Sequence, residues 1–443
     1  MDISSSLVKS TAVAALGGLL FGFDTAVIAG ATSQLRSAYS LSDTQLGITV
    51  SSALIGTIFG AMLAGIPGDR LGRRDSLRLM AVFYIVSALG CAFAWSWPAW
   101  ILFRFIGGLG IGGSSVLGPM YIAEIAPAKW RGRLVGFFQI NIVVGILLAY
   151  FSNFVIGLQG LGDAEWRWKL GISAVPAVLF FLMLFTIPRS PRWLVKKGRV
   201  REARAVLQQI GESDVETALQ DIVGSIDALH GHAQEPLFQS KFRLPIFLAV
   251  TIAMFNQLSG INAILYYLND IFAAAGFNKV SGDLQAVAIG FTNLIFTLLA
   301  MTVIDRLGRK KLLVTGAVGC AACLSGVAAI LSSGAHANLL VWLFAGFIAF
   351  FAFSQGAVIW VYLGEVFPTS VRANGQSLGS FTHWVMAAAI SFAFPVIGAH
   401  YSKAAPFVFF AVMTAVQFVV VLASYPETKG VSLEDLQKKL VAG

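Results

Sequence analysis

Two charged residues lie inside long apolar runs of this sequence, where charge is costly. Asp24 follows the segment Leu20–Phe23 in the first apolar run, and Arg104 lies near the start of the fourth. A charge at membrane depth costs roughly 3 kcal/mol or more, so such residues mark function. Burial favours the protonated acid, whereas a nearby cation favours the ionised acid. We therefore predict that Asp24 and Arg104 form a pair that binds and releases a proton; the alternative is a static structural ion pair.

A second set of side chains is neutral and polar within apolar runs. Amides both donate and accept hydrogen bonds, as a ligand rich in hydroxyl groups requires, and indole rings can stack on the apolar face of a small ring. The alternative is amide packing between helices, which contributes under about 2 kcal/mol for each residue. The candidates for this ligand site are Gln139, Gln257, Asn262, Asn293, Trp360 and Trp384.

The elements that must position these residues are membrane spans. Of the 443 residues, 57% are hydrophobic and 12% are charged, and the mean hydropathy is +0.78, which excludes an ordinary soluble protein. The first run lacks a cleavage pattern and is expected to remain a permanent helix. We predict spans near 8–30, 46–68, 76–96, 98–121, 133–157, 168–188, 243–270, 284–304, 311–332, 338–363, 374–398 and 404–425.

The net charge of +9 is concentrated in short loops at one end of the spans, which argues against a nucleic-acid partner. Loops after spans two, four and eight are rich in Arg and Lys, so the positive-inside rule places both termini in the cytoplasm. The stretch from Arg189 to Arg243 is the one long polar interruption. Helical spacing there predicts short surface helices, the second beginning at Ser213 because Ser213 and Glu216 have capping-box spacing.

Two loop motifs occur twice, in the same order and at nearly the same offset. The segment Gly68–Arg74 returns as Ile304–Lys310, and Glu124–Pro127 returns as Glu365–Pro368. The duplication predicts two six-helix halves that bind a substrate between them. We divide the chain into 1–188, a linker at 189–242, a second half at 243–425 and a tail at 426–443. The charged residues expected to hold the cytoplasmic ends together are Asp69, Arg73, Glu124, Arg131, Arg133, Asp305, Arg309, Glu365 and Arg372.

These motifs resemble those of the sugar porter family within the major facilitator superfamily. The segments that carry the resemblance are Asp69–Arg74, Pro188–Leu194, Gln257–Asn262 and Pro426–Gly430. The resemblance implies an all-α membrane protein with the major facilitator fold, twelve transmembrane helices and a short helical linker. It implies that Asp24 carries the proton beside Arg104. It also implies an outer gate at Tyr266 and Tyr267, although an aromatic belt at the membrane interface is an alternative.

Departures from the family pattern concern the sugar site. Asn256 stands where many relatives have glutamine, and His383 replaces the usual amide before Trp384. Ile146 is similar to the residue of the glucose carriers, which favours a hexose over a pentose. We assign Phe21, Ile146, Asn256 and His383 to the site with the six residues above. His383 also titrates near neutral pH when unperturbed, so a second proton group and simple packing are alternatives for it.

The sequence as a whole predicts a bacterial transporter of the inner membrane that imports a monosaccharide with a proton. We expect partners limited to the sugar, the proton and the lipid bilayer, with no nucleic acid, no cofactor, no metal and a monomeric state. The absence of a nucleophile–base pair argues against an enzyme. A facilitative uniporter in which Asp24 is structural is the main alternative, followed by a transporter-like sugar sensor.

Overall fold

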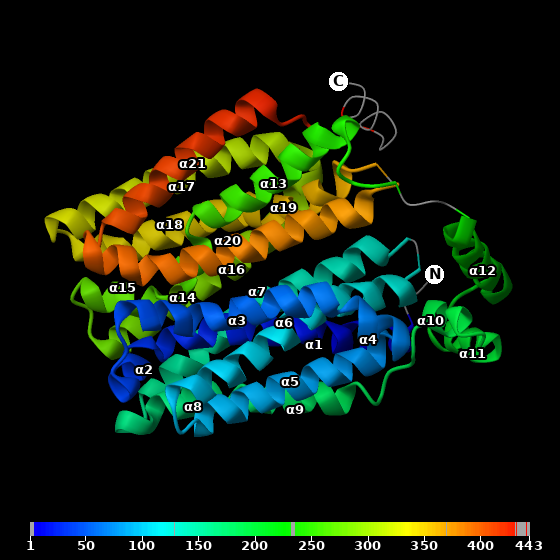
Figure 1. Cartoon of the computed structure of the whole chain (residues 1–443), viewed down its shortest axis with the longest axis horizontal. Coiled ribbons are helices and arrows are strands. Elements are labelled where there is room, and N and C mark those ends of the chain that lie inside the picture. The colour runs from blue at the N-terminus through cyan, green and yellow to red at the C-terminus, as the bar shows by residue number, and fades with distance from the viewer. Residues whose placement is uncertain are drawn as a thin grey trace. The chain divides into compact units, whose positions relative to one another are not determined.

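The computed structural model describes residues 4–127, 129–231, 235–368, 370–429, 431 and 440, and within them every regular element is helical. Twelve helical stretches in this part of the chain are long and apolar enough to cross a membrane, which confirms the predicted fold class. Figure 1 labels the elements. The first six spans are α1 (Ser5–Val27), α3 (Asp43–Leu63) with α4 (Gly65–Arg70), α5 (Arg73–Phe93), α6 (Trp97–Ile125), α7 (Arg131–Gly157) and α8 (Glu165–Gly171) with α9 (Ala174–Met183).

The last six spans follow three linker helices. The linker holds α10 (Pro191–Lys196), α11 (Val200–Gln209) and α12 (Val215–Gly231). The later spans are α13 (Arg243–Leu258) with α14 (Ile261–Tyr266), α16 (Lys279–Leu307), α17 (Arg309–Ser333), α18 (Leu340–Phe353) with α19 (Gln355–Glu365), α20 (Arg372–His400) and α21 (Ala405–Ser424). Four short helices extend the ends of spans: η1 (Ile28–Gly30), η2 (Gly162–Ala164), η3 (Ser240–Phe242) and η4 (Ala337–Leu339). Two others, α2 (Thr32–Tyr39) and α15 (Leu268–Ala274), lie between spans.

The sixth span lies nearer the N-terminus than predicted, at Gly162–Met183 rather than 168–188. The prediction left out the charged residues before 168. The structure includes them in the span, because their charged side chains have hydrogen-bond and ion-pair partners. Arg167 donates 2.7 Å to the carbonyl of Ala92, and Glu165 pairs with Lys279 at 2.5 Å. The linker also needs a correction: Asp214, not Ser213, caps α12, since the Asp214 carboxylate accepts from the Thr217 N–H at 3.1 Å.

The described residues form two compact units. Unit 1 comprises Met1–Thr25, Ile55–Ala149 and Arg167–Ala233. Unit 2 comprises Ala26–Leu54, Tyr150–Trp166 and Gln234–Gly443. Segments from the first six spans therefore pack within unit 2, together with all of the last six spans.

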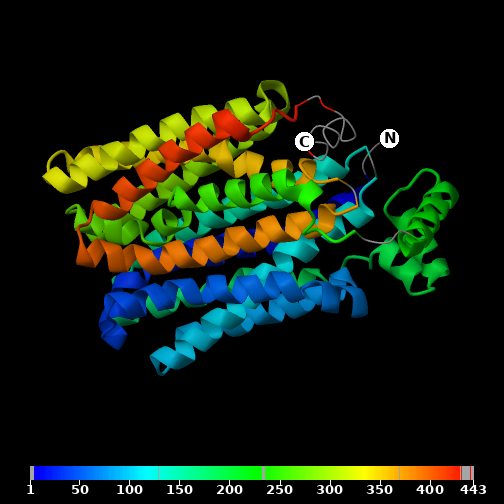
Figure 2. The same cartoon turned by 45° about the horizontal axis from the view of Figure 1, so that its top comes forward.

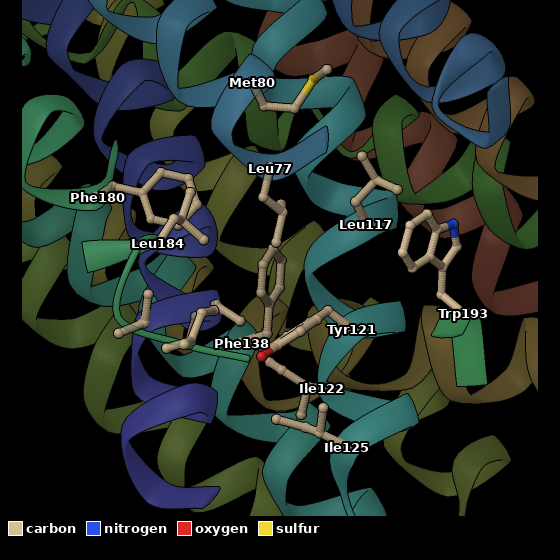
Figure 3. Close-up of a cluster of buried hydrophobic side chains, with 14 of the residues drawn as sticks. Leu77, Met80, Leu117, Tyr121, Ile122, Ile125, Phe138, Phe180, Leu184 and Trp193 are labelled. Carbon is tan, nitrogen blue, oxygen red and sulfur yellow. The ribbon is translucent and has the colours of Figure 1, made fainter. Parts of the chain in front are cut away.

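The core of unit 1 lies where α5, α6, α7 and α9 meet. Leu77, Leu117, Tyr121 and Phe180 are fully buried there, and Figure 3 shows them in one cluster. The Tyr121 hydroxyl donates to the carbonyl of Pro188 at 2.8 Å, which satisfies the one polar group that this ring brings into the core.

Close helix packing in unit 1 depends on two glycines at the crossing of α1 and α7. A Cβ added at Gly22 would lie 1.8 Å from the carbonyl oxygen of Ile142, and one at Gly145 would lie 2.0 Å from that of Leu19. Only hydrogen fits at such backbone approach. Because Gly22 precedes Asp24 by two residues, this crossing fixes where the buried acid lies.

We expect Gly22→Ala to lower the thermal unfolding temperature of the purified protein markedly, because the backbones of α1 and α7 must separate. Overpacking of this kind typically costs about 1–3 kcal/mol. The matched control is Gly224→Ala in α12, where nothing lies within 4 Å of an added Cβ. Alanine there should be neutral or stabilising by roughly 0.5–1 kcal/mol. Equal unfolding temperatures for the two variants would contradict this account of the crossing.

In unit 2, α17 runs between α18 and α21, and both views show α17 and the red α21 side by side (Figures 1 and 2). Two spans of this unit are interrupted. The seventh breaks between α13 and α14, where Gly260 has a φ of +82° that favours glycine. The tenth breaks at Ser354, between α18 and α19. At Gly260 and at Ser354 the backbone dihedral angles therefore depart from those of an α-helix.

Candidate functional site

The buried acid and the buried arginine predicted from sequence are in contact within unit 1. Arg104 Nη1 donates to Asp24 Oδ1 at 2.7 Å, and Arg104 Nη2 donates to the backbone carbonyl of Asp24 at 2.7 Å. Asp24 is 6% exposed and Arg104 is 3% exposed. The helices that bring them together are α1 and α6, and the residues lie 80 positions apart in sequence.

The second carboxyl oxygen of Asp24 takes no part in this pair. Asp24 Oδ2 is buried and has no hydrogen-bond partner among the residues that the structure describes. Protonation of this oxygen would neutralise the carboxyl without displacing Arg104, because one of its two bonds is to the backbone carbonyl.

A cluster of polar side chains surrounds the break of the seventh span in unit 2. Gln257 is its hub: Gln257 Nε2 donates to Asn256 Oδ1 at 3.0 Å and lies 3.2 Å from His383 Nε2. Asn262, beyond the break, donates to Gln257 Oε1 at 3.0 Å. Gly260 makes this last bond possible, because its conformation starts a new helix and turns Asn262 back toward Gln257.

Aromatic rings flank the imidazole of this cluster. The ring centroid of His383 lies 5.1 Å from that of Trp360 and 4.9 Å from that of Trp384. Trp384 is buried, whereas Trp360 is 40% exposed. Amides, an imidazole and a partly exposed indole are the groups that recognise hydroxyls and the apolar face of a sugar ring.

The remaining predicted sugar-site residues are placed as follows. In unit 1, Gln139 and Phe21 are half-buried and Ile146 is buried, on α7, α1 and α7. In unit 2, Asn293 is buried on α16, and its Oδ1 lies 3.5 Å from the Thr297 hydroxyl. Each unit thus holds its own part of the predicted set.

Both predicted gate tyrosines are buried in unit 2. Tyr267 donates to the carbonyl of Ser391 at 3.1 Å and stacks on Phe394, with ring centroids 5.1 Å apart. Tyr266 is 4% exposed. Residues of an interfacial aromatic belt face lipid, so the burial of both rings favours a packed contact over the belt.

The duplicated motifs form the same ion pair in each repeat. Arg73 binds Glu124 at 2.9 Å and Asp69 at 3.1 Å in unit 1. Arg309 binds Glu365 at 2.9 Å in unit 2. The side chain of Asp305, the counterpart of Asp69, lies outside what the structure describes. Both pairs are largely shielded from solvent, so salt screens them less than ordinary surface pairs.

Three predicted members of these networks have other contacts. Arg131 donates to the carbonyl of Ala126 at 3.4 Å, and Arg372 donates to that of Phe367 at 3.2 Å. Arg133 lies over the ring of Trp130, 5.2 Å from its centroid. None of the three forms an ion pair with Glu124 or Glu365 in the described part of the chain.

The structure shows further polar contacts near the duplicated motifs, made by residues that the sequence did not mark as members of the charge networks. Asp75 binds Arg78 at 2.7 Å and Arg189 at 3.0 Å, which joins the start of α5 to the segment before α10. In the second repeat, Thr428 donates to Glu365 at 2.6 Å. Thr428 lies in the motif Pro426–Gly430, so the sequence marks this segment as a family motif. The motif alone does not indicate that Glu365 is the residue it contacts.

Glu427 caps a helix of the second repeat. Its carboxylate accepts from the backbone N–H groups of Arg309 at 2.9 Å and Lys310 at 3.1 Å, the first residues of α17. Partial burial raises the pKa of this carboxyl, but hydrogen bonds from the backbone N–H groups of Lys429 and Arg309 outweigh it and hold the pKa below its usual range. Glu427 is therefore ionised at neutral pH and matches the positive end of the α17 dipole.

Ionisable residues buried within a bundle of spans mark substrate or ion pathways and proton relays. The profile of the family described as "Sugar (and other) transporter" matches residues 10–440. The chain is 36% identical to the D-xylose-proton symporter of Escherichia coli (strain K12), over 98% of this chain and 96% of that protein. It is 36% identical to the arabinose-proton symporter of Bacillus subtilis (strain 168), over 98% and 94%.

A solved structure agrees with this assignment. The inward-open conformation of the xylose transporter XylE from E. coli aligns with a TM-score of 0.88 and 33% identity, covering 98% of this chain and 100% of that one. The chain therefore belongs to the sugar (and other) transporter family, as its motifs predicted. This is a family of multi-pass membrane transporters and not of enzymes.

Proposed function

We propose that this protein imports a monosaccharide together with a proton, by alternating access of one central site to the two sides of the membrane. The observation that carries the proposal is the buried pair of Asp24 and Arg104, with Asp24 Oδ2 open to a proton. The names of the similar proteins support it, since they include symporters of xylose and of arabinose with protons.

In this proposal Asp24 carries the proton and Arg104 sets its affinity. The sugar binds to side chains from both repeats. Hydroxyl groups bond to the amides and His383, and the indole of Trp360 stacks on the ring. Ile146 lines the site with an apolar side chain, which favours a hexose. The full proposed set is Phe21, Gln139, Ile146, Asn256, Gln257, Asn262, Asn293, Trp360, His383 and Trp384.

The two six-helix halves, 1–188 and 243–425, are proposed to rock about this site, with the linker 189–242 and the tail from 426 on the cytoplasmic side. The pairs Arg73–Glu124 and Arg309–Glu365 then act as cytoplasmic locks. Tyr266 and Tyr267 act at the opposite end. A single chain contains every proposed component, so we propose a monomer in the inner membrane of a bacterium.

The orientation can be tested by labelling single cysteines in intact cells. Ser37 on α2 and Gln220 on α12 are exposed and lie at opposite ends of the spans in the proposal. In a background with Cys91, Cys320 and Cys323 replaced by Ser, a membrane-impermeant maleimide should label Ser37→Cys from outside. It should label Gln220→Cys only after the cells are opened. Labelling of both positions from one side would refute the proposed orientation.

The function itself is tested in proteoliposomes. Labelled xylose, arabinose and glucose are offered with the outside made acidic, at equal pH, and with a protonophore. Symport predicts accumulation above the external concentration only with the pH gradient, and collapse with the protonophore. Uptake that equilibrates but never accumulates would favour the uniporter. Binding without any flux would favour a sensor.

A further inference from the structure

A half-buried acid outside the predicted sites, with one carboxyl oxygen fully buried, lies between the seventh and eighth spans of unit 2. Asp270 is on α15, and the spans on either side are Ser240–Tyr266 and Lys279–Ile304. Its Oδ2 is buried and has no hydrogen-bond partner among the described residues. The Thr32 hydroxyl bonds the same carboxyl, and the charge of Arg36 acts on it. The carboxyl therefore lies in a contact between α15 and the segment formed by η1 and α2.

This contact joins the two repeats at the end of the spans remote from the duplicated motifs. Thr32 and Asp270 are more than 230 residues apart, and η1 packs against both α14 and α15. The same end is held by Tyr150, which donates to the carbonyl of Leu265 at 2.8 Å, and by Glu165 with Lys279 at 2.5 Å. Separation of the repeats at this end would expose Asp270 to water.

The charged groups around Asp270 are engaged with other partners. On α2, Arg36 binds Asp43 of α3 at 2.5 Å. On α16, Lys279 binds Glu165, and Asp283 accepts a short hydrogen bond from Asn269. Tyr267, which joins α14 to α15, interacts with Asp270 and Tyr266, and Lys403 donates to the carbonyl of Ala274. No cation lies within ion-pair distance of Asp270 in the residues that the structure describes.

We propose that Asp270 is a second proton-binding site, which holds this end of unit 2 closed when it is protonated and favours opening when it is ionised. A neutral carboxyl fits the packed contact, whereas an ionised one there has a buried oxygen without a hydrogen-bond donor and no cation within ion-pair distance among the described residues. The proposal rests on the proposed function only in taking this end of the spans as the outer one.

The direction of the pH effect follows from burial. Burial raises the pKa of Asp270 to about 6, against the hydrogen bond of Thr32 and the charge of Arg36, which lower it. In an open, hydrated form the pKa returns toward roughly 4. The raised pKa belongs to the closed form, so closure is favoured fully below pH 4, and the preference is lost as the pH rises through 6. The ratio of closed to open forms is expected to fall by about tenfold between pH 5 and pH 8.

The test measures this end directly, without sugar or transport. Spin labels are placed at Ser37→Cys on α2 and Ala273→Cys on α15, both exposed, after replacement of the three native cysteines by Ser. Double electron–electron resonance on the purified chain in nanodiscs gives the distance distribution from pH 5 to pH 8. We expect the short-distance fraction to fall with rising pH, with a midpoint near 6.

Variants identify the titrating group. Asp270→Asn should remain in the short-distance form at every pH, and Asp270→Glu should restore the pH response, which shows that the site still folds. Asp163→Asn, an exposed acid on η2, is the matched control and should respond as the parent does. Asp24→Asn should also keep the response, which separates this proton site from the first.

A distance distribution that does not change with pH in the parent protein would overturn the proposal, and so would a full pH response in Asp270→Asn. Failure of proton-driven sugar uptake with an intact distance response would instead reject the proposed function alone, because the distance measurement requires neither coupling nor sugar.

Discussion

Replacement of Asp24 by Asn is expected to abolish accumulation of sugar against its gradient while exchange of sugar between the two sides continues. Asparagine keeps the shape of the side chain and a partner for Arg104, but it cannot titrate. The bond from Arg104 to the backbone carbonyl of residue 24 is unaffected by the change. The variant is then always neutral, like the loaded carrier, and nothing couples its cycle to the proton gradient.

The expected loss is large. One charge moved down 100 mV supplies about 2.3 kcal/mol, which corresponds to roughly 40-fold accumulation. Gradient-driven uptake and counterflow exchange should be measured in the same vesicles, with Asp221→Asn on the exposed face of α12 as the control. Retained uphill uptake by Asp24→Asn would place the coupling proton elsewhere, with His383 the next candidate. Loss of both binding and exchange would make Asp24 structural.

Replacement of Gln257 by Ala is expected to weaken sugar binding by about 5- to 150-fold, the equivalent of roughly 1–3 kcal/mol for buried polar groups left unpaired. The side chain is fully buried and contacts Asn256, Asn262 and His383. Its removal therefore takes away one ligand and releases three others from their positions.

Binding by isothermal titration calorimetry in detergent or nanodiscs measures this effect without transport. Gln208→Ala on the exposed face of α11 is the matched control and should leave the affinity unchanged. A change of less than about twofold for Gln257→Ala would mean that the sugar binds elsewhere. A loss of affinity confined to one sugar of a panel would show that Gln257 reads a particular hydroxyl.

The spans and the buried ion pair could be predicted because each rests on a strong physical constraint. A window of apolar residues long enough to cross hydrocarbon has few alternatives to a spanning helix. A carboxylate within such a window needs a counter-ion, and Arg104 was the candidate inside another span; the structure joins it to Asp24. Duplication of the loop motifs likewise predicted that Arg73 and Arg309 would have equivalent partners.

Partner choice among charges near the helix ends could not be predicted, because several geometries have similar free energies there. Arg133 lies over Trp130 and Arg131 bonds to a backbone carbonyl, although Glu124 was an equally plausible partner for both. The cap of α12 moved by one residue, since Ser213 and Asp214 can both accept at a helix start. The contact of Asp270 required knowledge of which segments of the two repeats meet.

The cap that Glu427 places on α17 has a consequence for the order in which the protein matures. The ribosome synthesises α17 more than 90 residues before it synthesises Glu427. The first backbone N–H groups of α17 therefore lack this acceptor until the last span has been made. The link from Thr428 to Glu365 also forms only then. Chains released before residue 427 would carry all twelve spans but would leave the start of α17 without its cap and Glu365 without its bond from Thr428.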